Sequence, residues 1–277
     1  MVYGNGLSQY NHAAFAQKIR GHCLRMTHGG KSGHIGSMLS MADIIAVLYG
    51  SILNVSADQP KCDTRDRFIL SKGHGGAAVY AALAEKGFFP KDWLSTYYKD
   101  AGKLSGHISH HVPGVEFSTG SLGHGLPVAA GMALAARHAN KKHRIFCVMS
   151  DGDIDEGSTW EAIMFAAQHR MDNLVAIVDY NRIQALGKME DVIELEPFAD
   201  KIRAFGWAVK EINGHDCNQI EETLSYIPFE SGKPSFVIAK TIKGKGVSFL
   251  ENTVSCHYHA ITQTDLEKGL RQIGELA

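Results

Sequence analysis

The sequence of 277 residues carries no concentration of charge of either sign. It has 28 Lys and Arg against 29 Asp and Glu, which gives a formal net charge of −1, and no long run of either kind. Binding to nucleic acid or to a membrane surface depends on a concentrated basic face. The charge balance therefore argues against both kinds of partner.

Long hydrophobic runs and paired cysteines are also missing. No apolar segment approaches the roughly 20 residues of a membrane span, and residues 1–10 lack the apolar core of a signal peptide. The five cysteines form no Cys-x-x-Cys pair and are widely scattered: Cys23, Cys62, Cys147, Cys217 and Cys256. We therefore expect reduced thiols in a cytoplasmic protein rather than a secreted disulfide framework.

The sequence does contain enough apolar residues for a large core, and many glycines and histidines. Hydrophobic residues make up 44% of the chain, with 29 Gly and 15 His. Short apolar runs alternate with glycine-rich turns and helical stretches, and we find no repeat, linker or low-complexity tract. This pattern predicts one α/β domain over residues 1–277, an open, mainly parallel sheet with helices on both faces.

The most informative stretch runs from residue 145 to residue 186. Ile145–Met149 and Leu174–Val178 are short continuous apolar runs, typical of buried parallel strands. Ser158, with Glu161 three residues later, predicts the capping box of a helix between them. Both strands of such a unit end at the same edge of the sheet. Asp151 and Asn181 are therefore predicted to lie side by side.

This pair of side chains suits a divalent cation. A carboxylate and an amide carbonyl are hard oxygen ligands, which Mg²⁺ and Ca²⁺ prefer. Gly152 allows close approach of the backbone, and the following helix N-terminus favours an anion. One cation and one diphosphate would satisfy the site. The alternative is an acidic turn followed by an Asx turn, with no ligand at all.

Several other elements follow from local signals. We expect a helix over 10–27, a glycine-rich loop over 28–36, a helix capped by Ser40, and a terminal helix capped by Thr264 with Glu267. Gly30-Lys31-Ser32 is not a phosphate-binding P-loop, because Arg25 stands where its first glycine is required.

The Asp-Gly-Asp…Asn pattern resembles the diphosphate-binding motif of thiamine diphosphate enzymes, and the residues around it resemble transketolases. In that family the Asp, the Asn and a backbone carbonyl two residues later hold the metal. The resemblance thus implies thiamine diphosphate with Mg²⁺ (or Ca²⁺), bound by Asp151, Asn181 and the carbonyl of Ile183. Ser150 replaces the first glycine of the family motif.

The same resemblance assigns four histidines to the active site. His34, His74, His107 and His257 stand in glycine or strand-end turns that match transketolase positions. In the family these residues line the substrate channel, bind the diphosphate and the donor hydroxyls, and help move protons, which suits a group that titrates near neutral pH. His74 and His257 are also implied to contact the cofactor.

Further cofactor contacts are implied at two loops and one turn. Gly120, Ser121 and Leu122 match the loop beside the aminopyrimidine, with His124 where a glutamine is common. The remaining implied contacts are Gly152, Asp153, Glu156 and Lys243. Glu156 has the alternative of compensating a helix dipole, and Lys243 that of a solvated lysine on a turn.

One departure from the family pattern and one alternative qualify this picture. Cys256-His257-Tyr258-His259 replaces the usual Trp-His-Gly of the family, and the extra bulk is expected to reshape the substrate pocket. His107, His110 and His111 could alternatively form a zinc site, but no cysteine or well-spaced fourth ligand accompanies them.

The resemblance covers only the first half of a transketolase. The second domain of the family carries the glutamate that activates the cofactor and most groups that grip the substrate phosphate. We therefore expect the N-terminal subunit of a split enzyme, with the pyrimidine-binding domain on a separate chain, in an α₂β₂ assembly.

The implied reaction moves a two-carbon ketol unit from a ketose (phosphate) to an aldose (phosphate). The alternatives are a component of a deoxyxylulose phosphate synthase-like or 2-oxo acid-decarboxylating enzyme, and a non-catalytic regulatory subunit that retains the fold.

Overall fold

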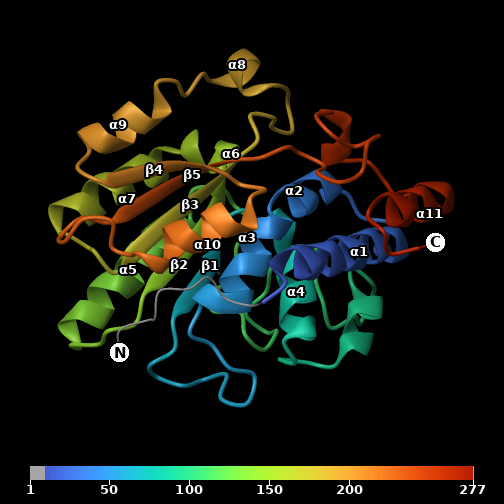
Figure 1. Cartoon of the computed structure of the whole chain (residues 1–277), viewed down its shortest axis with the longest axis horizontal. Helices are drawn as coiled ribbons and strands as arrows, with labels where there is room; N and C mark the ends of the chain where they lie inside the picture. Colours follow the sequence, from blue (N-terminus) through green and yellow to red (C-terminus); the bar gives the residue numbers. More distant parts are fainter. Residues whose placement is uncertain (1–9, 277) are drawn as a thin grey trace.

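The computed structural model describes residues 10–276, and its centre is a parallel sheet of five strands (Figure 1). The strand order is β1-β2-β3-β5-β4, and every neighbouring pair runs parallel. The strands are β1 (Arg67–Leu70), β2 (Ile145–Ser150), β3 (Leu174–Tyr180), β4 (Ala208–Asn213) and β5 (Ser235–Lys240). The predicted open parallel sheet is confirmed.

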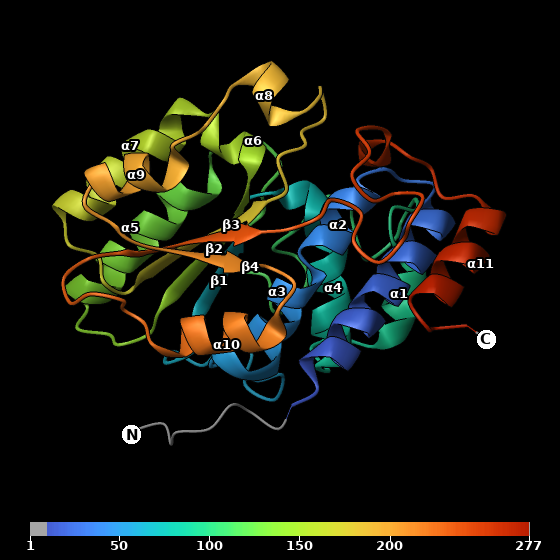
Figure 2. The same ribbon diagram turned by 45° about the horizontal axis from the view of Figure 1, so that its top comes forward.

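Helices cover both faces of this sheet (Figures 1 and 2). The α-helices are α1 (His12–Gly30), α2 (Ile35–Ser40), α3 (Ala42–Val47), α4 (Gly76–Glu85), α5 (Gly125–His138), α6 (Asp151–Ile154), α7 (Gly157–Gln168), α8 (Met189–Val192), α9 (Phe198–Ala204), α10 (Cys217–Ser225) and α11 (Gln263–Gln272). Shorter turns are the π-helix η1 (Leu48–Ile52) and the 3₁₀ turns η2 (Gly73–Gly75), η3 (Lys91–Thr96) and η4 (Ser255–His257).

Alternation along the strands divides the interior into two cores. On β2, Phe146 and Val148 pack into the core that contains residues of α1, α3, α4 and α10. Ile145, Cys147 and Met149 pack into the other core, with residues of α5, α7 and α9. Because successive side chains of a strand point to opposite faces, a strand covered on both faces must be apolar throughout. This explains the continuous apolar runs of the sequence.

The predicted start of the helix after β2 is wrong. α7 begins at Gly157, with no side-chain cap at Glu156, and the Ser158 hydroxyl donates instead to the carbonyl of Gly123 at 2.9 Å. The capping box belongs to Ser150 and Asp153, which cap α6. A capping box is therefore present, but it begins at Ser150, eight residues before the predicted Ser158.

Three further predicted element boundaries also differ from the structure. α2 starts at Ile35, so Ser40 ends a helix, and its hydroxyl donates to the Asp179 carboxylate at 2.5 Å. α11 is capped by Thr262 with Asp265 rather than by Thr264. Since α1 extends to Gly30, the glycine-rich loop is shorter than predicted.

Within residues 10–276, no helix is long and apolar enough to cross a membrane.

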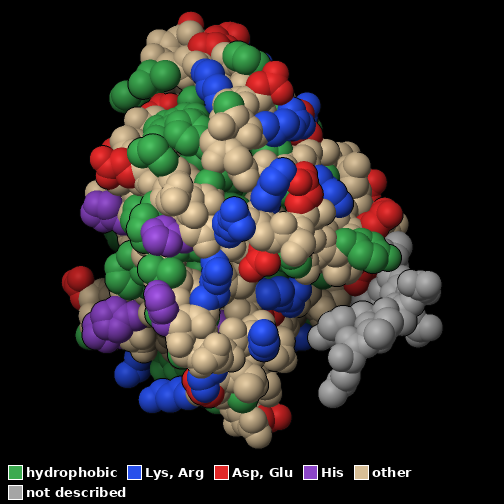
Figure 3. Space-filling model, turned by 90° about the vertical axis from the view of Figure 1, so that its left-hand side faces the viewer, with side chains coloured by type: hydrophobic (Ala, Val, Ile, Leu, Met, Phe, Trp, Pro, Cys, Tyr) green, Lys and Arg blue, Asp and Glu red, His purple; other side chains and the backbone are tan. Residues whose placement is uncertain are grey.

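The face at the left of Figure 1 carries grouped hydrophobic side chains (Figure 3). On α7 of this face, Met164 is 57% exposed and Phe165 is 42% exposed.

Candidate active site

The candidate site lies at the carboxyl ends of β2 and β3. These neighbouring strands pair in register, with Ser150 opposite Asp179. Asp151 opens α6 directly after β2, and Asn181 follows β3. The parallel pairing therefore brings the two predicted ligand residues to the same edge, as the sequence indicates.

Asp151 is a buried carboxyl group that the protein leaves bare. The residue is only 1% exposed, and neither of its carboxylate oxygens has a hydrogen-bond partner among the described residues. Burial, reinforced by the nearby Asp179 carboxylate, raises the pKa of Asp151 to about 8, while Lys72 and the backbone of Arg182 oppose the rise. A buried charge without a partner is costly. Such a group is explained best by a cation that it would bind.

The turn after β3 supplies the two other predicted oxygens. Asn181 is 9% exposed, and its Oδ1 accepts a hydrogen bond from the Ile183 N–H at 3.2 Å. The Ile183 carbonyl accepts one from Lys243 Nζ at 2.8 Å. Since each of these oxygens has a second lone pair, both retain a place for a cation. The backbone of Arg182, between them, faces Asp151.

No three His, Cys, Asp or Glu side chains among the described residues gather where they could hold a metal ion. A cation at Asp151 would thus depend on amide and carbonyl oxygens and on the oxygens of a ligand. This donor set suits Mg²⁺ or Ca²⁺, which take oxygen ligands, and is unsuited to zinc. The zinc alternative for His107, His110 and His111 finds no support here.

Lys243 is a buried lysine rather than a solvated one. It is 1% exposed, and its Nζ also lies 3.2 Å from His257 Nδ1. Burial, together with the Lys72 ammonium, lowers the pKa of Lys243 to about 8. A buried ammonium beside a bare carboxyl and a turn of carbonyls is well placed to meet an anion.

Asp153, which the sequence assigned to the cofactor, is fully used by the protein. One carboxylate oxygen accepts from the Ser71 hydroxyl at 2.6 Å and the Gly123 N–H at 2.9 Å. The other accepts from the N–H and hydroxyl of Ser150, both at 2.9 Å. Asp153 thus ties together the ends of β1 and β2 and the loop that ends at Gly125, and its contact with the cofactor stays a prediction.

That loop brings the next group of predicted residues to the site. Gly120 lies beside His107, because a Cβ on this glycine would come within 3.4 Å of the imidazole. Leu122 reaches Gly152, where an added Cβ would lie 3.0 Å from Leu122 Cδ1. Ser121 is exposed. Gly152 thus permits close approach of this loop, and its close approach to a ligand stays a prediction.

Glu156 is exposed at the start of α7 and makes no side-chain capping bond. Its side chain lies against Gly123, where a Cβ would approach Glu156 Cβ to 2.5 Å. The structure leaves both interpretations of Glu156 open. An acidic group at the start of a helix compensates the helix dipole whether or not it also contacts the cofactor.

The four predicted histidines form one cluster around His34. The ring centroid of His34 lies 4.9 Å from that of His257, 5.2 Å from that of His74 and 5.8 Å from that of His107. His74 and His257 are buried, at 8% and 9% exposure, whereas His107 is exposed. The structure thus brings together four residues from positions 34 to 257 of the chain.

The backbone of His34 is strained to achieve this. Its φ of 68° lies in the left-handed region, which non-glycine residues rarely adopt. The His34 N–H donates to the His257 carbonyl at 2.5 Å, which holds the two turns together. Such strain is often found at functional sites.

The buried imidazoles are held neutral. Burial, and then the Lys243 ammonium, lowers the pKa of His257 to about 3. Burial and Lys72 lower the pKa of His74 well below its usual value, and burial also lowers the pKa of His34. A neutral imidazole offers one donor and one acceptor nitrogen. His34, His74 and His257 can therefore bind hydroxyl groups as neutral rings.

Sequence reasoning missed the ion pair beneath the site. Lys72 Nζ lies 2.5 Å from Asp179 Oδ2, and both side chains are completely buried. Lys72 also donates to the Ser37 carbonyl at 3.1 Å, and Thr241 donates to Asp179. The sequence did contain a signal for this pair. Lys72 and Asp179 are charged residues in or next to apolar strands, and charged residues are almost never buried unpaired.

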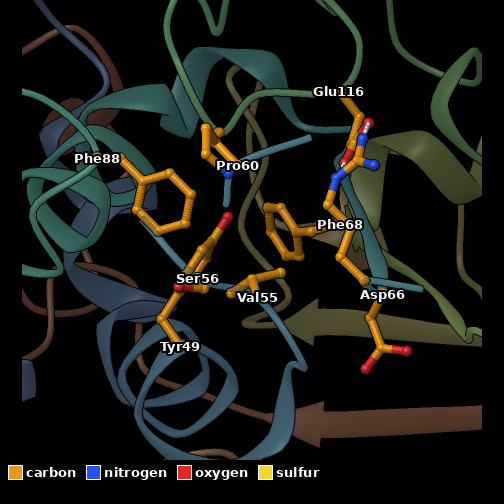
Figure 4. A pocket seen from close by; sticks show the side chains of 10 residues that line it. Tyr49, Val55, Ser56, Pro60, Asp66, Phe68, Phe88 and Glu116 are labelled. Atoms are coloured by element: carbon orange, nitrogen blue, oxygen red, sulfur yellow. Dashed lines mark hydrogen bonds and ion pairs between the residues drawn. The ribbon is translucent and has the colours of Figure 1, made fainter. Parts of the chain in front are cut away.

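Two pockets of the described surface lie away from this site. The pocket in Figure 4, at the amino end of β1, is lined by side chains that include Tyr49, Phe68 and Phe88. Its volume of about 10 Å³ has room for roughly one water molecule.

The larger pocket, of about 250 Å³, lies beside Arg20, Asp43 and His215. There Arg20 and His215 pair with Asp43 at 2.6 and 2.8 Å. Both carboxylate oxygens of Asp43 therefore have hydrogen-bond partners, unlike those of Asp151.

Comparisons with known proteins agree with this geometry. Residues 11–275 match the family described as "Transketolase, thiamine diphosphate binding domain". The chain is 40% identical over 260 residues to a protein of Phocaeicola vulgatus that is named as one of the subunits of an apulose-4-phosphate transketolase, covering 94% of this chain and 92% of that one. It is 42% identical over 232 residues to the 6-deoxy-6-sulfo-D-fructose transketolase subunit SqwG of a Clostridium species, covering 83% and 84%.

Solved structures give the same result. The transketolase of Campylobacter jejuni superposes with a TM-score of 0.90 at 32% identity, over 96% of this chain and 43% of that one. The transketolase of Leishmania mexicana gives 0.91 at 29% identity, over 97% and 42%. The chain thus spans about two-fifths of these solved transketolases. With its fold, its strand-end site and these similarities, the chain belongs to the transketolase family, as its thiamine diphosphate-binding domain.

Proposed function

We propose that this chain is the N-terminal, diphosphate- and metal-binding subunit of a two-chain transketolase. The observation that carries the proposal is the bare, buried carboxyl of Asp151 beside the turn 181–183. A fold that was retained for packing alone would have no reason to bury an unsatisfied carboxyl group. This weighs against a non-catalytic regulatory role.

The metal would be Mg²⁺ (or Ca²⁺), held by Asp151, Asn181 and the carbonyl of Ile183. Lys243, which donates to that carbonyl at 2.8 Å, is in reach to balance the charge of a diphosphate. Thiamine diphosphate, when bound, supplies the electron sink for breaking and forming a carbon–carbon bond. The proposed contacts to it are Gly120, Ser121, Leu122, Gly152, Asp153, Glu156, His74, His257 and Lys243.

His34, His74, His107 and His257 are the proposed groups for binding and proton transfer. Lys243 Nζ lies against His257 Nδ1, so the proton of this neutral ring is on Nε2, which can donate to a sugar hydroxyl. His74 Nε2 lies 3.3 Å from Ser37 Oγ, which orients its ring. A neutral imidazole that accepts a proton becomes a charged imidazolium, whose free-energy cost rises with burial. Proton transfer is therefore proposed first for the less buried rings, His34 and His107.

We further propose that residues 1–277 are one domain and that the pyrimidine-binding domain lies on a separate chain, in an α₂β₂ assembly. The relative from Phocaeicola vulgatus, itself named as a transketolase subunit, has nearly the same length as this chain, which covers 92% of it. The exposed Met164 and Phe165 of α7 offer an apolar surface for assembly. The free state of all five cysteines fits a cytoplasmic location.

The substrates would be a ketose donor and an aldose acceptor, with or without phosphate groups. The test is to purify the chain together with the pyrimidine-binding chain and to measure two-carbon transfer with Mg²⁺ and thiamine diphosphate. We expect transfer with the pair, and none with either chain by itself. Decarboxylation of a 2-oxo acid without any ketol transfer would contradict the proposal.

A further inference from the structure

Tyr258 stands where the transketolase resemblance places a glycine, and its ring lies at the histidine cluster. Its centroid is 4.8 Å from that of His257 and 5.7 Å from that of His34, both in edge-to-face arrangement. The side chain is 69% exposed. An aromatic ring this exposed is usually a surface residue, but this one contacts two of the four clustered imidazoles.

Exposure differs among these rings: His107 and Tyr258 are exposed, and the other three are buried or half-buried. His74 and His257 are 8% and 9% exposed, His34 is half-buried, and Tyr258 is 69% exposed. The ring of Tyr258 therefore stands at the outer margin of the cluster, beside His257 and His34. A glycine at this position would leave that margin open.

The backbone of Tyr258 is fixed from both sides. Gly33 packs so closely that an added Cβ would lie 3.2 Å from Tyr258 Cα, and the neighbouring His34 N–H bonds the His257 carbonyl. On the other side, His259 Nε2 lies 3.1 Å from Asp265 Oδ2, at the start of α11. These contacts restrain the segment that carries the ring.

We propose that Tyr258 determines specificity by narrowing the mouth of the substrate channel, so that short aldose acceptors are favoured over long ones. The inference rests on the proposed function, since it concerns the acceptor of the same reaction. Removal of a side chain that blocks the far end of a substrate changes discrimination between substrates on the order of tenfold or more.

The test compares acceptors of two and five carbons, glycolaldehyde and ribose 5-phosphate, in the enzyme assembled from both chains. For Tyr258→Gly we expect the ratio of kcat/KM for the five-carbon over the two-carbon acceptor to rise on the order of tenfold, mainly through a lower KM. For Tyr258→Phe, which keeps the ring, we expect the wild-type ratio.

Tyr226 provides a matched control, because it is 63% exposed and lies at the end of α10, before β5. Tyr226→Gly should leave the ratio unchanged. An unchanged or lower ratio in Tyr258→Gly would overturn the inference, as would equal effects of Tyr258→Gly and Tyr258→Phe. If wild-type enzyme transfers no ketol unit to either acceptor, the proposed function itself fails, which separates the two results.

Discussion

Asp151 and Asp153 stand two residues apart in one turn, are equally buried, and have opposite surroundings. Asp153 accepts four hydrogen bonds from Ser71, Gly123 and Ser150. Asp151 accepts none from the described residues, and its pKa is raised to about 8. The protein has thus satisfied the carboxylate that builds the turn and left bare the one that faces the ligand side. Surroundings, rather than burial, separate structural from functional acids here.

Lys72→Met should cause the largest loss of stability, because it removes the partner that keeps the buried Asp179 ionised. Breaking a buried ion pair by deleting one member costs about 3–5 kcal/mol. We expect a loss of that size in the free energy of unfolding, measured by denaturant titration. A matched Lys188→Met, at an exposed pair, should cost less than about 1 kcal/mol.

Asp153→Asn should destabilise the chain next most, because an amide retains only one of the two accepting oxygens. Each donor left unsatisfied costs about 1–3 kcal/mol. Thermal and denaturant unfolding of the metal-free chain measure this loss. A variant as stable as wild type would show that the four hydrogen bonds do not build the turn.

Asp151→Asn should have an effect that depends on pH. Because folding raises the pKa of Asp151 from 3.8 to about 8, its contribution to stability is complete below about pH 4 and is lost as pH rises through 8. Over that range the loss is about 1.4 kcal/mol per pH unit. The amide does not titrate, so the stability of the variant relative to wild type should rise steadily from about pH 5 to about pH 8 without metal.

A difference between Asp151→Asn and wild type that is constant with pH would contradict this account. Comparison at each pH removes the opposing contributions of His74 and His257, whose lowered pKa values make the folded chain less stable as pH falls below 6.5.

The smallest expected effect comes from the second capping box, Thr262 with Asp265. It has the same bonds as Ser150 with Asp153 but lies at the surface. Thr262→Ala should cost about 1 kcal/mol, and Thr264→Ala within about 0.5 kcal/mol. If both variants lost the same free energy of unfolding in denaturant titration, Thr262 would not be the dominant cap of this helix.

The sequence predicts the sheet and the meeting of Asp151 with Asn181, because buried parallel strands are apolar and their carboxyl ends share an edge. It does not predict which of two nearby hydroxyl residues caps a helix. Ser40 and Ser158 were available as caps, but distant partners, Asp179 and the Gly123 carbonyl, take their hydroxyl groups. The same limit applies to Asp153, whose four donors come from three separate segments.

Calorimetric titration with Mg²⁺ and thiamine diphosphate, of the chain assembled with its pyrimidine-binding partner, tests the central claim most directly. The account predicts that wild type binds both together, that Asp151→Asn abolishes binding, and that Asp200→Asn, at an exposed position on α9, leaves it intact. Undiminished binding by a folded Asp151→Asn variant would show that this bare carboxyl group is not the metal ligand.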